Sequence, residues 1–139
     1  MTPTSSADSG NGSVHAATAM PISDAAWKAL QGGYDLQVHV APDVIERRID
    51  DLDLSKEFLA HGLRGFVLKP HYFPTAERAK VVSRAVPGIS AYGAIALNHS
   101  VGGLNPVAME LADRSGCKIV WMPRWTPRTK LPDAWTDQT

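Results

Sequence analysis

Four short apolar segments recur along the chain every ~25–30 residues, which is the length of a βα unit. They are residues 34–40, 64–69, 89–97 and 117–121. The first segment alternates apolar and polar residues, and the others are near-continuously apolar. Near-continuously apolar strands are buried on both faces, as parallel strands covered by helical crossovers are. The spacing therefore predicts an α/β fold built from parallel (βα) units. Both a doubly wound sheet and a TIM-type (β/α)8 barrel satisfy the pattern.

The segment before the first strand and the three segments between strands carry helix signals. Their first residues are good N-caps, namely Ser23, Asp50 or Asp51, Thr75 and Asn105, the last followed by Pro106. Glycine ends each segment, at positions 32–33, 62, 88 and 116. The predicted order is helix, strand, helix, strand, helix, strand, helix, strand.

Composition narrows the choice of partner. The chain has 14 Lys and Arg residues against 14 Asp and Glu residues, so its charge does not favour nucleic acid or an anionic membrane. It has no apolar run of the ~18 residues that a membrane span requires. Its single cysteine, Cys117, has no internal partner for a disulfide. We therefore expect a cytoplasmic protein whose partner is neither nucleic acid nor a membrane; the small-molecule substrate that we also expect is implied by the resemblance described below.

The chain divides into three parts. Residues 1–22 are rich in Ser, Thr, Gly and Ala and are expected to be disordered. Residues 23–123 contain the four predicted strands. Residues 124–139 break the strand–helix rhythm, and we expect them to be an irregular tail translated out of frame; the alternative is a genuine irregular tail.

Polar residues gather at the predicted carboxyl ends of the strands, where ligands bind in both candidate folds. In chain order they are Gln37, His39, Lys69, His71, Asn98, His99, Gly102 and Gly103. Three of the five histidines of the chain are among them. The sequence therefore predicts one polar site at this edge.

Gln37 and His39 lie two residues apart on one strand, so they share a face about 6–7 Å apart. Neutral imidazole is the commonest protein ligand for zinc-like ions, so His39 and His71 are candidate metal ligands. The alternative for His39 is a core histidine held by hydrogen bonds.

The remaining candidates are substrate contacts. Lys69 is either an anchor for a carboxylate or phosphate, a carbamylated metal bridge, or a lysine that reaches solvent. Gly102 and Gly103 offer backbone N–H groups to an anion, or simply form a helix-entry turn. Asn98 and His99 are placed at the same edge.

Four blocks in order resemble the amidohydrolase superfamily of metal-dependent hydrolases. Residues 35–43, DLQVHVAPD, resemble its D-x-H-x-H segment, and residues 67–75, 96–106 and 119–123 resemble blocks of an uncharacterised bacterial family within it. The resemblance implies a (β/α)8 barrel in which a zinc or manganese ion activates water against a small amide, ester or lactone-like bond. It implies metal ligands at His39 and His71.

Two departures from the superfamily pattern lower the expected activity. Gln37 replaces a histidine, and an amide is a weaker ligand than imidazole. A (β/α)8 barrel also needs ~250 residues, so we expect this chain to be the truncated N-terminal half of one and inactive by itself.

Two alternatives stay open, namely a PHP-type phosphoesterase fragment and a non-enzymatic half-barrel that binds or assembles. We also expect self-association through open sheet edges.

Overall fold

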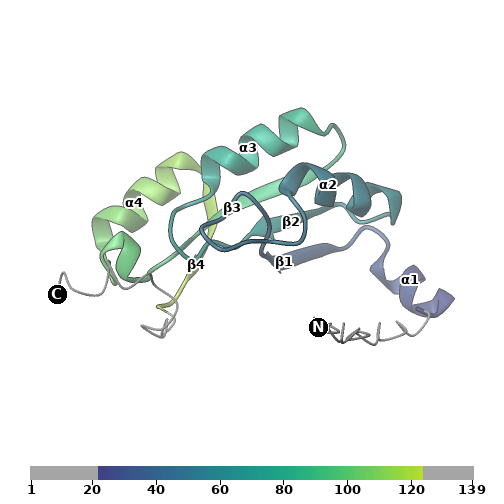
Figure 1. Cartoon of the computed structure of the whole chain (residues 1–139), viewed down its shortest axis with the longest axis horizontal. Coiled ribbons are helices and arrows are strands. Elements are labelled where there is room, and N and C mark those ends of the chain that lie inside the picture. Colours follow the sequence, from purple (N-terminus) through teal and green to yellow (C-terminus); the bar gives the residue numbers. More distant parts are fainter. Residues whose placement is uncertain (1–21, 124–139) are drawn as a thin grey trace, which may run out of the picture.

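The structure is a computed structural model and describes residues 22–123. Helices and strands alternate through this part of the chain (Figure 1). In chain order they are α1 (Asp24–Leu30), β1 (Tyr34–Val38), α2 (Asp51–Ala60), β2 (Gly65–Leu68), α3 (Ala76–Ala85), β3 (Ser90–Ala96), the short 3₁₀ helix η1 (His99–Val101), α4 (Pro106–Ser115) and β4 (Cys117–Trp121). The predicted disordered segment, except for Ile22, and the predicted out-of-frame tail, 124–139, lie outside the described residues.

The four strands form one sheet in the order β1-β2-β3-β4, and every neighbouring pair is parallel. This confirms the predicted α/β fold of parallel (βα) units. Helices α2, α3 and α4 all lie on the same side of the sheet (Figure 1). A sequential order with helices on one side matches half of a (β/α)8 barrel, whereas a doubly wound sheet carries helices on both sides.

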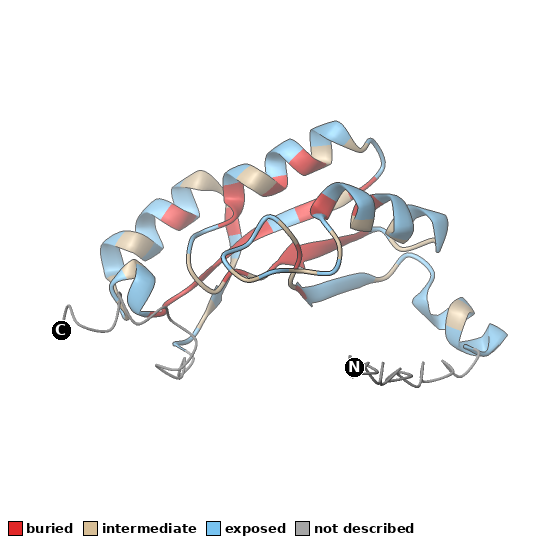
Figure 2. Ribbon diagram, viewed as in Figure 1, coloured by how far each residue is buried: buried red, intermediate tan, exposed pale blue. Residues whose placement is uncertain are grey.

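The core lies between the sheet and these helices, where buried residues line the facing surfaces (Figure 2). Phe66 and Leu68 of β2 pack with Ala79 and Val82 of α3. A second cluster joins Ile95 of β3 to α3 and α4. Because side chains alternate along a strand, the residues between these core positions point to the side of the sheet without helices.

Close packing of α3 on β3 depends on a glycine. A Cβ atom at Gly93 would lie 2.3 Å from the Cα of Ala76, so no other residue fits there.

Thr75, just before α3, was predicted to cap this helix, but its side chain makes no capping hydrogen bond. Its hydroxyl instead accepts from the backbone N–H of Ala94 at 3.0 Å and donates to the carbonyl of Leu68 at 2.7 Å. Thr75 thus ties the loop after β2 to β3.

Two details of the described part differ from the expectation. Strand β1 ends at Val38 instead of residue 40, and its pairing with β2 shifts register between Asp35 and Val38. The 3₁₀ helix η1 was not predicted.

Within residues 22–123, no helix has the length and apolar character needed to span a membrane.

Candidate functional site

The side chains of His39 and His71 stack on one another at the carboxyl edge of β1 and β2. Their ring centroids are 4.4 Å apart and the rings are inclined by 6°. His39 directly follows β1, and His71 follows β2 in the loop that leads to α3. The structure therefore brings together the two imidazoles that the sequence places at neighbouring strand ends.

His39 lies on the side of the sheet without helices, because its neighbours Val38 and Val40 both belong to the core beneath α2 and α3. Its ring is half-buried, and its Nδ1 atom is buried with no hydrogen-bond partner among the described residues. The alternative interpretation, a histidine held by hydrogen bonds, therefore does not account for this nitrogen.

The surroundings of His39 lower its pKa below the ordinary value. Burial is the largest cause, followed by the positive charges that His71, Arg47 and Lys69 bring near the ring; Asp43 acts in the opposite direction. The imidazole is therefore neutral at neutral pH. That is the form which binds a metal ion or accepts a proton.

Lys69 and Trp121 form a second pair on the same side of the sheet. The Nζ atom of Lys69 lies 4.3 Å from the centroid of the Trp121 ring. Lys69 follows β2 and Trp121 ends β4, so the contact crosses β3, whose residues there are Ala94 and Ala96. We call the surface formed by His39, Lys69, His71, Ala94, Ala96 and Trp121 the helix-free face.

Trp121 is a site residue that the sequence interpretation missed. Its Nε1 atom is buried and has no hydrogen-bond partner among the described residues. The available signal was its position: it ends the fourth predicted strand, at the same edge as the histidines.

Asn98 is buried and holds the loop that carries His71. Its Nδ2 atom donates to the carbonyl oxygen of His71 at 2.9 Å, and the hydroxyl of Ser100 lies 3.5 Å from the same oxygen. Asn98 thus contributes to the position of His71. His99 is exposed in η1.

Gly102 and Gly103 follow η1 with positive φ angles of 84° and 70°. Their N–H groups donate to the carbonyls of His99 and Asn98, at 2.9 Å in both cases. Since both donors are used within the turn, the helix-entry turn accounts for these two glycines.

Gln37 is exposed near the end of β1. Its backbone N–H donates to Oδ1 of Asp35 at 2.8 Å, within the stretch where β1 shifts register against β2.

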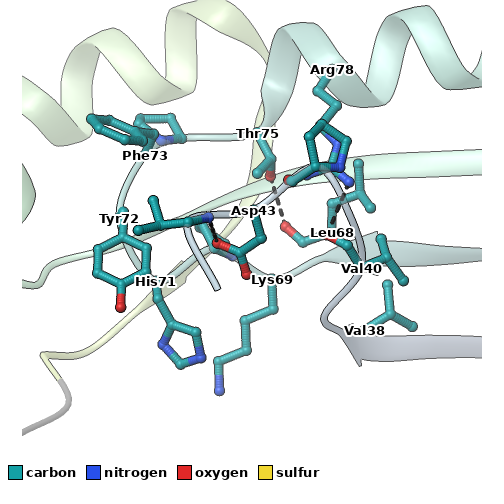
Figure 3. A pocket seen from close by; sticks show the side chains of 14 residues that line it. Val38, Val40, Asp43, Leu68, Lys69, His71, Tyr72, Phe73, Thr75 and Arg78 are labelled. Atoms are coloured by element: carbon teal, nitrogen blue, oxygen red, sulfur yellow. Dashed lines mark hydrogen bonds between the residues drawn. The ribbon is translucent and has the colours of Figure 1, made fainter. Parts of the chain in front are cut away.

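A cavity of about 380 Å³ lies between the loops that follow β1 and β2. Asp43, Phe73, Thr75 and Arg78 are among the residues that line it (Figure 3). The carboxylate of Asp43 is paired with Arg47 at 2.5 Å. Figure 3 shows the side chains of Lys69 and His71 pointing the same way, away from Thr75 and Arg78. Lys69 and His71 are also among the residues that line the cavity, so the cavity and the helix-free face meet at these two residues.

The described residues fit a metal ion in ligand type but supply few ligands. Among residues 22–123, no three His, Cys, Asp or Glu side chains are grouped closely enough to hold an ion. The nitrogen lone pairs of an imidazole lie in the plane of its ring, so two rings stacked at 6° do not direct them at one point. Binding one ion between them requires that one ring turns.

Comparison with curated proteins and with solved structures gave no match. A comparison with protein families matched residues 32–137, which is most of the chain and includes all four strands and every site residue discussed above. The chain belongs to this family, which is described as "Family of unknown function (DUF6282)".

Proposed function

We propose that this chain carries part of the active site of a metal-dependent hydrolase of the amidohydrolase type. The observation that carries the proposal is the His39–His71 pair at the carboxyl edge of two neighbouring parallel strands. Ligands bind at this edge in barrels and in open α/β sheets alike.

His39 and His71 are the residues that would hold a divalent ion such as zinc or manganese. A bound ion of this kind would supply an activated water molecule to attack a small amide, ester or lactone-like bond. The neutral state of His39, which its lowered pKa ensures, leaves the nitrogen available for a ligand. Its Nδ1, buried and unpartnered within the described part of the chain, supports this role, because a buried polar atom is rarely left without any partner.

Lys69 would bind and orient the substrate. Its ammonium group is held over the Trp121 ring and so has a fixed position on the helix-free face. Asn98 would position His71 through the hydrogen bond to its carbonyl.

Metal titration tests the proposal directly. The full chain is stripped with a chelator, and zinc and manganese are then titrated in with calorimetric detection. We expect saturable but weak binding, which His39→Ala and His71→Ala each weaken by about tenfold or more.

His61→Ala is the matched control. His61 is also a stacked histidine, with its ring 4.8 Å from that of Trp27, but it lies at the end of α2. Its removal should leave metal binding unchanged. Equal losses in all three variants, or no loss in any, would refute the assignment of ligands.

Small-molecule binding and phosphate-ester cleavage, each measured with and without metal, separate the alternative functions. An assembly or binding module would bind small molecules without metal, and its affinity would not change when zinc is added. A PHP-type phosphoesterase would instead cleave phosphate esters once loaded with several ions.

A further inference from the structure

The cavity between the loops that follow β1 and β2 has no role yet in the proposed hydrolase. We propose that it binds an uncharged apolar group of the substrate, about the size of one substituted ring. That this group belongs to a substrate rests on the proposed function, whereas the binding of the group does not.

Most of the residues that line the cavity are apolar or aromatic. Val38 ends β1, Val40 follows it and Leu68 ends β2, and all three are buried (Figure 3). The two loops supply the other apolar and aromatic lining residues, which are Pro42, Val44, Pro70, Tyr72, Phe73 and Pro74. A lining of this kind, with a few polar groups, is typical of sites for small molecules.

Three polar side chains in the lining already interact within the protein. The guanidinium of Arg78 is paired with Asp51, and the carboxylate of Asp43 is paired with Arg47. The hydroxyl of Thr75 both donates and accepts a hydrogen bond within the sheet. A charged group that entered the cavity would lose its hydration, and these residues would have to leave their present partners to compensate it. The lining therefore favours an uncharged group.

The other two polar residues in the lining place the cavity beside the proposed metal site. They are Lys69 and His71, and Figure 3 shows their side chains pointing away from Arg78. The ammonium group of Lys69 lies over the Trp121 ring, and the ring of His71 stacks on that of His39. A group bound in the cavity therefore lies next to one of the two proposed metal ligands.

Two large apolar side chains of the lining are in contact with water. Phe73 is 66% exposed and Val44 is 64% exposed. They come from the two different loops, after β2 and after β1. An apolar ligand that covers both would remove carbon surface from water, which is the main favourable contribution to binding of this kind.

The size and the rigidity of the cavity suit a small ring. Its volume is about 380 Å³, whereas an apolar cavity of about 150 Å³ holds one benzene molecule. Three prolines in the lining have fixed φ angles, and Arg78 holds the carbonyl of one of them, Pro42, at 2.6 Å. Because the walls are held in this way, a ligand loses little free energy in ordering them.

The experiment follows the valine methyl groups of the full chain, labelled with ¹³C and freed of metal by a chelator. An aromatic ring shifts the signals of the methyl groups that it contacts. Val44 and Val81 are assigned with Val44→Ala and Val81→Ala. Val81 is the internal control, because it is also 64% exposed but lies on α3, outside the lining. We expect a saturable shift of the Val44 signal, and none of the Val81 signal, when benzamide is titrated in.

Two comparisons of probes test the chemistry of the group. Benzamide should bind at least about tenfold more tightly than acetamide, which has the same polar head and only one methyl group. The second comparison keeps the ring and changes its far end. The neutral probe 4-methylbenzamide should bind at least about tenfold more tightly than 4-carbamoylbenzoate, an anion, and 4-(aminomethyl)benzamide, a cation.

Phe73→Ala should raise the dissociation constant of 4-methylbenzamide by about fivefold or more, since it removes a ring from the lining. Leu104→Ala is the matched control. Leu104 is also 66% exposed and also precedes a helix, α4, but it lies outside the lining, so its removal should leave the constant unchanged. Far-ultraviolet circular dichroism checks that both variants are folded. If Phe73→Ala does not fold, the comparisons of probes in the parent chain still decide the question.

Three outcomes would overturn the proposal: no saturable shift of the Val44 signal, benzamide binding no more tightly than acetamide, or a charged probe binding as tightly as 4-methylbenzamide. The titrations are done without metal, so their results are independent of the proposed metal ligands. Binding of the neutral ring with no metal binding would leave the cavity as a binding site and remove the proposed hydrolase. Metal binding without binding of the ring would do the reverse.

Discussion

Arg78 of α3 donates from Nε to Oδ2 of Asp51, the first residue of α2, at 2.6 Å. The same guanidinium donates to the carbonyls of Val40, at 3.2 Å, and Pro42, at 2.6 Å, and also to that of Ala41. One side chain thus joins two helices to the segment that directly follows His39. Both partners of the ion pair are largely shielded from solvent, with side-chain exposures of 24% and 10%.

We therefore expect Arg78→Ala to lower the free energy of unfolding by about 2–4 kcal/mol, because it leaves a shielded carboxylate and several carbonyls without their donor. Urea unfolding followed by circular dichroism measures this change. Arg78→Lys should recover only part of the loss, since one ammonium group cannot reproduce a planar fork of donors.

Lys80→Ala on the exposed side of α3 is the control and should change stability by no more than about 0.5 kcal/mol. A loss in Arg78→Ala as small as this would show that the guanidinium contributes little to the fold.

The second prediction concerns Gln37, which stands where the resembled superfamily pattern has a histidine. Gln37→His adds an imidazole two residues before His39 and should tighten zinc binding on the order of tenfold. Competition with a chromophoric chelator gives the two dissociation constants. In a His39→Ala background, Gln37→His should tighten zinc binding much less. An equal tightening in both backgrounds would contradict a metal site shared by residues 37 and 39.

The third prediction follows from the lowered pKa of His39. The unfolded chain takes up a proton at the ordinary value of about 6.5, whereas the folded protein takes it up only at lower pH. The unfolded state therefore binds more protons between these two values, so stability falls as the pH drops from about 6.5 to the folded-state pKa. His39→Gln should lose less stability than the parent when unfolding is compared at about pH 7.5 and about pH 5.5, on either side of the ordinary value.

Nuclear magnetic resonance titration of the ring protons checks the cause. His71→Gln should raise the pKa of His39 without restoring it, because burial is the larger effect and the charge of His71 comes second. Asp43→Asn should lower it further, since that carboxylate favours the protonated ring. A rise in Asp43→Asn would show that the two side chains interact differently in solution.

Much of this architecture follows from the sequence by simple rules. Apolar runs indicated β2, β3 and β4, and alternation of apolar and polar residues indicated β1. Asn105 and Gly116 bounded α4 as capping preferences predict. The proximity of His39 and His71 follows from topology, because neighbouring parallel strands end at the same edge, but the position of His71 also depends on the hydrogen bond from Asn98. Thr75 is a position where these rules fail. It precedes α3 as a capping residue would, but its hydroxyl forms hydrogen bonds with the carbonyl of Leu68 in β2 and the N–H of Ala94 in β3.

The contacts that the sequence did not predict are made by long side chains that extend to residues distant in the sequence. Lys69 meets Trp121 only because the strand between them carries alanine, a condition that no local pattern expresses. Arg78 contacts carbonyls 36 to 38 residues away in sequence, so neither periodicity nor a motif indicates it. Both contacts nevertheless determine which groups surround His39.

The last prediction concerns the two edge strands of the described sheet. Strands β1 and β4 each pair on one side only, and both expose apolar side chains: Leu36 is 55% exposed and Val120 is 45% exposed. Open edges of this kind pair with other chains. We therefore expect the protein to self-associate with increasing concentration, as measured by light scattering coupled to size-exclusion chromatography.

Leu36→Lys should shift the equilibrium toward the monomer, since a charged residue on an edge strand opposes pairing. Leu111→Lys is the control, because Leu111 is 60% exposed but lies on the helix α4 and not on a strand. A parent chain that stays monomeric at high concentration, or an equal effect of the two lysines, would refute association through the sheet edge.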